Sequence, residues 1–196
     1  GTAFDLPAGL HVTVAVVAAA VAGALWAAIP GLLKAKLRVH EVIVSIMLNY
    51  TALYITNYLI RNVLTDNADT TERIAETASL RSEFLSGITD YSRLHWGIVI
   101  AIIGAIIMWF ILEKTKTGYE LKAVGFNEEA SRYAGMNVSK NIVFSMVISG
   151  AFAGLAGAME GLGTYEFTSV KSGFSGIGFD GIAVALLGGN TAIGVV

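Results

Sequence analysis

The sequence of 196 residues contains no cysteine and few charged residues. The absence of cysteine excludes disulfides, thiolate metal sites and cysteine nucleophiles, and we expect no metal site. Charged residues make up 14% of the chain and the formal net charge is −2, so no basic face is available for nucleic acid. With 55% hydrophobic residues and a mean hydropathy of +0.66, the chain is too apolar for a typical soluble domain. The composition therefore indicates a membrane protein.

Familiar motifs of enzymes are also missing. No H-E-x-x-H zinc motif, P-loop or dinucleotide fingerprint occurs, so the motifs predict neither an enzyme nor an ATP-binding subunit. The run GFSG at 173–176 matches the G-x-S-G pattern of rhomboid-type intramembrane serine proteases, which need a histidine base on a later helix. All histidines here precede the serine; they are His11, His40 and His95. An intramembrane serine protease remains an alternative of another class, because a base could lie on a segment beyond residue 196.

Four apolar runs are about as long as a bilayer-spanning helix, which needs roughly 18 or more residues. They cover residues 10–33, 41–60, 96–112 and 141–162. A fifth run over 181–196 is shorter and is broken by glycine and asparagine. Pro30 and Gly31 predict a break or kink near the end of the first run. We therefore predict an all-α fold, a polytopic transmembrane helical bundle that forms one membrane domain over 1–196.

The basic residues predict which ends of these helices face the cytoplasm. Lys34, Lys36 and Arg38 follow the first run. Further basic residues follow the third run; they are Lys114, Lys116, Lys122, Arg132 and Lys140. Because positive charge collects on the cytoplasmic side, both connections should be cytoplasmic. The segment 64–95 is more acidic and should be an extracellular loop, within which 71–78 is expected to form a short helix.

A polar segment over 113–140 lies between the third and fourth runs and predicts a short helix. Asn127 is the expected N-cap, and Glu128 and Glu129 place negative charge in the first turn, where the helix dipole favours it. Gly135 supplies a left-handed stop. A helix of about two turns is not stable in water by itself. We expect it to rest on the bilayer surface or on another protein, unless the segment is an ordinary linker that carries helix caps.

The second apolar run carries a polar stripe. Tyr50, Tyr54, Asn57 and Arg61 recur at helical spacing, and Asn49 lies next to them in sequence. Phenol and amide groups along such a stripe can offer hydrogen bonds to an uncharged polar solute, so we expect these residues to line a pathway. Hydrogen bonding between helices is the alternative.

The later runs carry two carboxylates and a set of spaced glycines. Glu160 lies near the outer end of the fourth run, where it should be close to water because burying its charge is costly. Asp180 lies in a glycine-rich stretch, and we expect it to help form the external mouth of the pathway. The glycines are spaced four, three and four residues apart and predict one continuous groove for close helix packing. They are Gly150, Gly154, Gly157 and Gly161.

The segment around the short helix resembles a known motif, G-x-N-x-x-A-(A)-x-x-x-G-(I/M). It is matched by Gly125, Asn127, Ala130, Gly135 and Met136. This pattern resembles the cytoplasmic coupling loop of bacterial ABC importer permeases, in the family that serves branched-chain amino acids, ribose and nucleosides. Ser131 replaces the second alanine, which is a small-for-small change. In that family the loop fits into a groove on a cytoplasmic ATPase. With this resemblance we expect the following residues of the loop to take part in ATPase coupling: Gly125, Asn127, Glu128, Glu129, Ala130, Arg132 and Gly135.

Longer stretches over 40–50, 149–167 and 178–189 look most like nucleoside permeases of this family, guanosine-type ones in particular. The resemblance covers essentially the whole chain and implies an internal piece of a longer multi-pass protein of the bacterial plasma membrane. It further implies an extracellular substrate-binding protein that docks on 64–95, a second permease subunit, and ABC ATPase subunits that bind ATP and magnesium. This chain would then hold no cofactor and no catalytic residue. A permease for a ribose-like sugar or a branched-chain amino acid is the alternative within the family.

Overall fold

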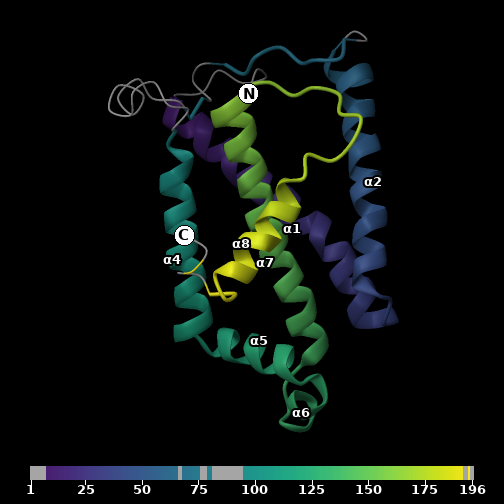
Figure 1. The fold of residues 1–196 in the computed structure, drawn as a ribbon, viewed down its shortest axis with the longest axis vertical. Coiled ribbons are helices and arrows are strands. Elements are labelled where there is room, and N and C mark those ends of the chain that lie inside the picture. The colour runs from purple at the N-terminus through teal and green to yellow at the C-terminus, as the bar shows by residue number, and fades with distance from the viewer. Residues whose placement is uncertain (1–7, 66–67, 76–78, 81–94, 192–193, 195–196) are drawn as a thin grey trace.

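The computed structural model describes residues 8–65, 68–75, 79–80, 95–191 and 194 of the chain. Over these residues the elements are all helical, and two of them are π-helical turns that continue α2 and α7 (Figure 1). In chain order they are α1 (Ala8–Leu37), α2 (Glu41–Leu59), η1 (Ile60–Leu64), α4 (Gly97–Lys114), α5 (Lys116–Phe126), α6 (Glu128–Tyr133), α7 (Val138–Met159), η3 (Glu160–Tyr165) and α8 (Ile177–Leu187).

Four helical stretches are long and apolar enough to cross a membrane. They are Gly9–Leu37, Glu41–Leu64, Gly97–Lys114 and Val138–Tyr165. α8 is also apolar but shorter, and it overlaps the beginning of the broken fifth run. The long stretches coincide with the four apolar runs of the sequence, so the predicted all-α polytopic bundle is confirmed.

The predicted break does not form at Pro30, because α1 continues through it to Leu37, and a kink there stays a prediction. Proline removes one backbone hydrogen bond from a helix, yet membrane helices tolerate this loss where neighbouring helices support the turn. Here Pro30 and Gly31 are both buried, and a Cβ on Gly31 would lie 3.1 Å from Met146 Cβ of α7. We attribute the intact helix to this packing of α7 against the proline turn.

The pair α1 and α7 forms the centre of the bundle and makes the most extensive contact among the described elements. A Cβ on Gly23 of α1 would collide with Gly150 O of α7, and a Cβ on Gly154 would collide with Ala19 O. Backbones can approach this closely only where side chains are absent or very small. The crossing of the two helices therefore depends on Gly23, Gly150 and Gly154.

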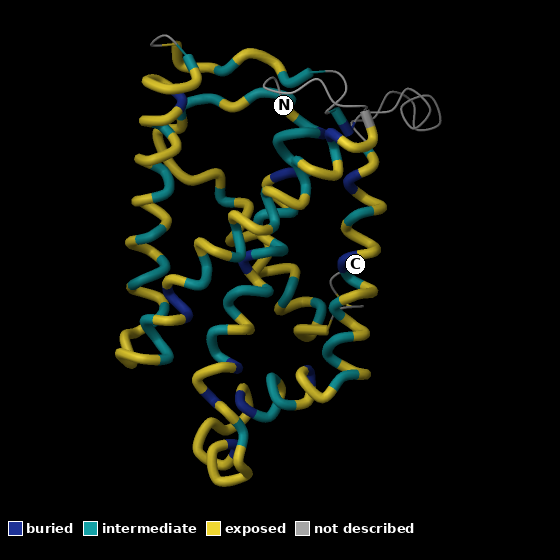
Figure 2. The backbone as a smooth tube through the Cα atoms, turned by 180° about the vertical axis from the view of Figure 1, so that it is seen from behind, coloured by how far each residue is buried: buried dark blue, intermediate teal, exposed yellow. Residues whose placement is uncertain are grey.

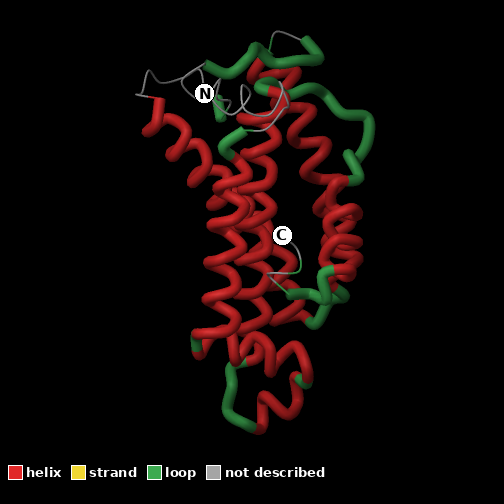
Figure 3. Tube along the Cα trace, turned by 60° about the vertical axis from the view of Figure 1, so that its left-hand side comes forward, coloured by secondary structure: helices red, strands yellow, loops and turns green. Residues whose placement is uncertain are grey.

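The close contact is shorter than the predicted groove of four glycines. A Cβ on Gly157 or Gly161 would meet no other atom within 4 Å in the described part of the chain. The first turns of α1 lean away from α7 (Figure 3), so the two backbones separate beyond Gly154. The regular helix α7 also passes into the π-helical turn η3 at Glu160. Within the described residues no neighbour packs against Gly157 or Gly161, so close packing along their part of the groove stays a prediction.

Residues 68–75, called the outer segment below, lie across one end of the bundle and pair with the chain that follows α7 (Figure 1). Thr71 N donates to Thr168 O at 2.9 Å, and this pairing is antiparallel. The helix predicted over 71–78 does not form in its described part, 71–75, since backbone groups there bond to the later segment. Residues 76–78 lie outside the described residues.

The helices α5 and α6 lie at the end of the bundle opposite this outer segment (Figure 1). The connection between α1 and α2 lies at the same end as α5 and α6, as the predicted orientation requires. Exposed residues run along most of the bundle (Figure 2), and the structure buries no described residue of α2 or α8. No described residue of these two helices is therefore fully covered by the rest of the described chain.

Candidate functional site

Helix α5 turns the chain sideways at the end of α4, and the sequence prediction of a single short helix omits it. Gly118 N donates to Thr115 Oγ1 at 3.1 Å, and Thr115 Oγ1 donates to Ile111 O at 2.6 Å. Gly118 carries no Cβ, so α5 can lie directly against the backbone of Ile111 and Leu112. Thr115 is a favoured N-cap residue directly after the third apolar run, and this is the sequence signal that indicates the helix.

Helix α6 follows at once, with the caps that the sequence predicts. Asn127 Oδ1 accepts a hydrogen bond from Ala130 N at 3.0 Å, and Glu128 and Glu129 occupy the first turn. Gly135 has a φ of 82°, which is the left-handed conformation that favours glycine. The predicted N-cap, the left-handed stop and the short length of this helix are confirmed.

A buried side chain ties these two helices to the bundle. Asn141 of α7 is 4% exposed, and its Nδ2 donates to Glu120 Oε2 of α5 at 3.2 Å. Ser131 of α6 is also 4% exposed, so one face of this short helix is packed. The ion pair of Arg132 with Glu129, at 3.4 Å, lies on the exposed side and contributes little to stability. The bond between Asn141 and Glu120 is therefore the main polar link from α5 to α7.

Two aromatic rings flank α6 and lie open to solvent. Phe126, the last residue of α5, is 90% exposed, and Tyr133, the last residue of α6, is 92% exposed. Single exposed apolar residues are common on proteins, but aromatic side chains are enriched where proteins bind one another. The two exposed rings therefore lie at the two ends of the short charged helix α6. The sequence prediction names neither ring, although aromatic residues in an otherwise polar connection are the available signal.

A pocket of about 460 Å³ lies between the end of α1, α5 and the start of α7. Its lining includes Lys34, Gly125, Glu128 and Asn141. Lys34 also forms an ion pair with Glu41 at 2.8 Å, which links α1 to α2. The ends of these helices and the beginning of α6 therefore meet in one small region.

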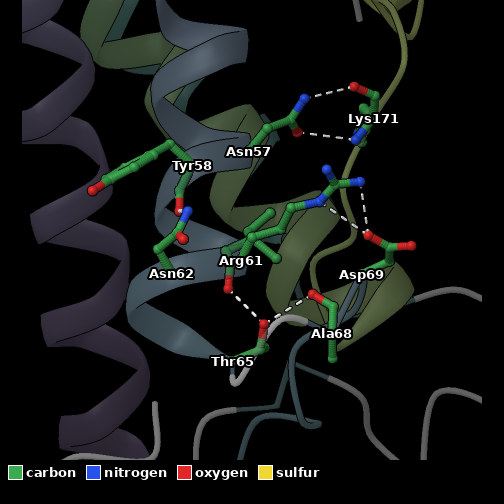
Figure 4. A network of polar contacts seen from close by, with 9 residues as sticks. Asn57, Tyr58, Arg61, Asn62, Thr65, Ala68, Asp69 and Lys171 are labelled. Atoms are coloured by element: carbon green, nitrogen blue, oxygen red, sulfur yellow. Dashed lines mark hydrogen bonds and ion pairs between the residues drawn. The ribbon is translucent and has the colours of Figure 1, made fainter.

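At the opposite end of the bundle, side chains of α2 hold the chain that follows η3 (Figure 4). Asn57 Nδ2 donates to Lys171 O at 2.8 Å, and Lys171 N donates to Asn57 Oδ1 at 3.0 Å. Arg61 Nη2 lies 2.9 Å from Asp69 Oδ1 of the outer segment. Both polar atoms of the Asn57 amide bond to the backbone of Lys171, so this side chain positions the later segment.

Next to this contact, α2 and the segment 168–175 line an open pocket of about 330 Å³. The rings of Tyr50 and Phe174 meet edge to face beside it, with centroids 4.8 Å apart and planes at 71°. Asn49 lines the pocket together with Asn57. The structure thus brings three of the predicted pathway residues together and adds Phe174, which no local sequence pattern connects with α2.

The other predicted pathway residues lie elsewhere. Tyr54 is 67% exposed on α2 and is not among the residues that line this pocket. Asp180 is exposed in the first turn of α8. Glu160 is half-buried at the start of η3. None of these three side chains is brought to the pocket beside Asn49 and Tyr50.

The surroundings of Ser175 do not support the alternative of an intramembrane serine protease. Ser175 lines the pocket beside α2 and forms no hydrogen bond with another described residue. A serine nucleophile needs an adjacent base, so this arrangement does not favour proteolysis. Within the described ranges, no group of three or more His, Asp or Glu side chains could hold a metal ion.

Comparison with known proteins places the chain among membrane permeases. The family described as "Branched-chain amino acid transport system / permease component" matches residues 3–196. The guanosine ABC transporter permease protein NupP of Bacillus subtilis (strain 168) is 67% identical over 100% of this chain and 56% of that protein. The nucleoside ABC transporter permease protein NupB of Lactococcus lactis subsp. cremoris (strain MG1363) is 43% identical over 98% of this chain and 54% of that protein. The glucose ABC transporter permease protein TsgB13 of Haloferax volcanii is 34% identical over 97% of this chain and 52% of that protein.

No solved structure matches the chain. The chain spans about half the length of the curated relatives it matches. Its membrane-long helices agree with these relatives in making it a multi-pass protein of the cell membrane. Because the family match extends over nearly every residue, the chain belongs to the permease family of the branched-chain amino acid transport systems.

Proposed function

We propose that this chain forms part of the transmembrane subunit of an ATP-driven ABC importer, and that α5 and α6 couple it to a cytoplasmic ATPase. The observation that carries this proposal is the state of α6: it is too short to persist alone, yet it is capped, packed through Ser131 and flanked by the exposed rings of Phe126 and Tyr133. Such a short projecting helix suits a groove on a partner protein. ATP and magnesium would bind to that partner.

Direct contacts connect α5 and α6 with the membrane helices, so a movement of α6 is passed on to them. α5 is held to α4 by Thr115 and by the close packing of Gly118, and to α7 by the bond between Asn141 and Glu120. α7 in turn contacts α1 along the Gly23 crossing. Closely packed elements move as units because packed interiors are hardly compressible. ATP-driven movement of the partner therefore shifts α4, α7 and α1 as a group relative to α2.

We assign nucleosides as the substrate class. NupP and NupB, which are named for guanosine and for nucleosides, are 67% and 43% identical to this chain, whereas the glucose permease TsgB13 is 34% identical. A ribose-like sugar or a branched-chain amino acid is the alternative within the family. An extracellular substrate-binding protein would dock at the outer end, on the segment 64–95, and a second permease subunit would complete the pathway.

Uptake of radiolabelled guanosine tests the substrate class, in cells that express the permease containing this chain together with its partner subunits. Excess unlabelled inosine should abolish uptake of the label, whereas ribose and leucine should not compete. Cells that import radiolabelled ribose or leucine through this permease but no guanosine would replace the nucleoside assignment with the corresponding alternative.

Crosslinking tests the coupling proposal separately. A cysteine introduced by Glu128→Cys, in the first turn of α6, should crosslink to the ATPase subunit. Glu72→Cys, on the exposed outer segment, is the matched control and should give no such product. A Glu128→Cys variant that never reaches an ATPase, or that reacts with an impermeant reagent from outside the cell, would contradict coupling through α6.

A further inference from the structure

Two contacts hold one segment against α2 at different levels of the helix. The Asn57 amide exchanges hydrogen bonds of 2.8 and 3.0 Å with the backbone of Lys171, and the Tyr50 ring meets the Phe174 ring at 4.8 Å. The segment therefore passes from Lys171 to Phe174 while α2 is followed backwards from Asn57 to Tyr50. Figure 1 shows this chain descending beside α2 before it enters α8. These two antiparallel segments form the walls of the open pocket of about 330 Å³.

The walls of this pocket carry uncharged polar groups that are free to bind. Asn49, Thr56 and Ser175 line it, and none of their side chains has a hydrogen-bond partner among the described residues. An amide and two hydroxyls can each donate and accept hydrogen bonds. Within a membrane such groups are stable only where water or a polar solute satisfies them. A solute with several hydroxyl groups meets this requirement.

The ring pair beside these groups adds a surface for a planar solute. Tyr50 is 49% exposed and Phe174 is 48% exposed, so about half of each side chain remains uncovered although the rings touch. Aromatic side chains bind nucleobases by stacking, and this binding tolerates any base because every base has a π-face. A simple sugar has no such face. The combination of hydroxyl-binding groups and rings therefore favours a solute that has both a sugar and a base.

The charges around the pocket disfavour an amino acid. None of the described lining residues is acidic, and Lys171 is the charged member of the set. The nearby carboxylate of Asp69 is already paired with Arg61 at 2.9 Å. The ammonium group of an amino acid would therefore find no free carboxylate here, and burial of an unpaired charge is costly.

We propose that this pocket is a nucleoside-binding site on the translocation pathway. The ribose lies toward Asn49, Thr56 and Ser175, and the base lies against Tyr50 and Phe174. The inference rests on the proposed function, because it names where in the chain the proposed substrate is bound. It assigns Asn57 as a positioning residue, which keeps the two walls together through its contact with Lys171.

Single cysteines test occupancy, since the 196 residues contain no cysteine of their own. In the assembled transporter, Thr56→Cys and Ser175→Cys should react with a water-soluble maleimide. Guanosine supplied with the binding protein and ATP should slow both reactions about tenfold, whereas leucine should not. Ile55→Cys is the matched control: Ile55 is 45% exposed, adjoins Thr56 and does not line the pocket. Its labelling rate should not respond to guanosine.

The aromatic contact is tested by uptake. Phe174→Ala should lower the rate of guanosine uptake about tenfold, and Phe174→Tyr, which keeps the ring, should restore it. If guanosine does not change the labelling of Thr56→Cys and Ser175→Cys in a transporter that still imports guanosine, the proposed binding site is overturned and the proposed function is not. A transporter that imports no nucleoside would overturn both. Equal protection of the two cysteines by ribose would overturn the role of the rings.

Discussion

Asn141 of α7 donates a hydrogen bond from its side-chain amide to the Glu120 carboxylate of α5 across 3.2 Å, at a position where Asn141 is only 4% exposed. Glu120 is held a second time by the exposed Lys116, at 3.7 Å. Asn141 Nδ2 also donates to Asn137 O at the start of its own helix, at 3.1 Å, so the bond to Glu120 is the one of its two printed hydrogen bonds that joins α7 to α5. The movement of α5 is therefore tied to that of α7.

Replacing Asn141 by leucine should uncouple transport from ATP hydrolysis. Leucine has a similar size but no donor, and a hydrogen bond to a charged group contributes about 1.5–3 kcal/mol. We expect fewer nucleoside molecules to be imported per ATP hydrolysed in proteoliposomes that contain the whole transporter. Lys116→Ala is the control, since this side chain is 89% exposed and its ion pair contributes about 1 kcal/mol or less. An equal loss of coupling in both variants would show that the buried bond is unimportant.

Replacing Gly135 by valine should misdirect α6. The φ of 82° at this residue is strained for any residue with a Cβ, at a cost of about 1–2 kcal/mol, and a β-branched residue fits it poorly. We expect membrane insertion to remain normal and nucleoside-stimulated ATP hydrolysis to fall. Gly135→Asn should be milder, because asparagine tolerates the left-handed conformation. If nucleoside-stimulated ATP hydrolysis is normal in the valine variant, the orientation of α6 is not required for coupling.

The sequence contains the signals for α6 but not those for the pocket beside α2. Asn127 and Gly135 act on residues within one turn of themselves, so their effects can be read from local spacing. Asn57 meets Lys171 across 114 residues of sequence, and no local pattern specifies that pairing. The same limit explains why 71–75 is not helical: its backbone partners belong to a segment that folds back from after η3.

The glycine spacing in α7 is a second example of this limit. The repeat predicts which face of the helix carries no side chains, but the point where α7 crosses α1 depends on where the two helices separate in space.

Replacing Gly154 by leucine should destabilise the transporter, because a side chain there collides with the backbone of Ala19. Overpacking of this kind costs about 1–3 kcal/mol or more. Gly157→Leu is the matched control, with open space around its Cβ within the described residues. Thermal unfolding of the purified transporter in detergent measures the difference, and a larger effect at Gly157 would refute the assigned crossing.

Replacing Phe126 and Tyr133 by serine should weaken binding of the ATPase without disturbing the membrane helices. At 90% and 92% exposure, neither ring packs against the rest of the described chain, so their removal costs the permease little stability. Aromatic residues at the centre of an interface commonly contribute more than 1 kcal/mol each, and the double variant should bind the ATPase at least about tenfold more weakly. Co-purification of the ATPase with the tagged permease measures this loss. Tyr119→Ser is the control, because Tyr119 is 66% exposed near the start of the same helix pair and lies away from α6. If the double variant retains the ATPase as well as the control does, the two rings do not contribute to binding and the docking surface lies elsewhere on α5 and α6.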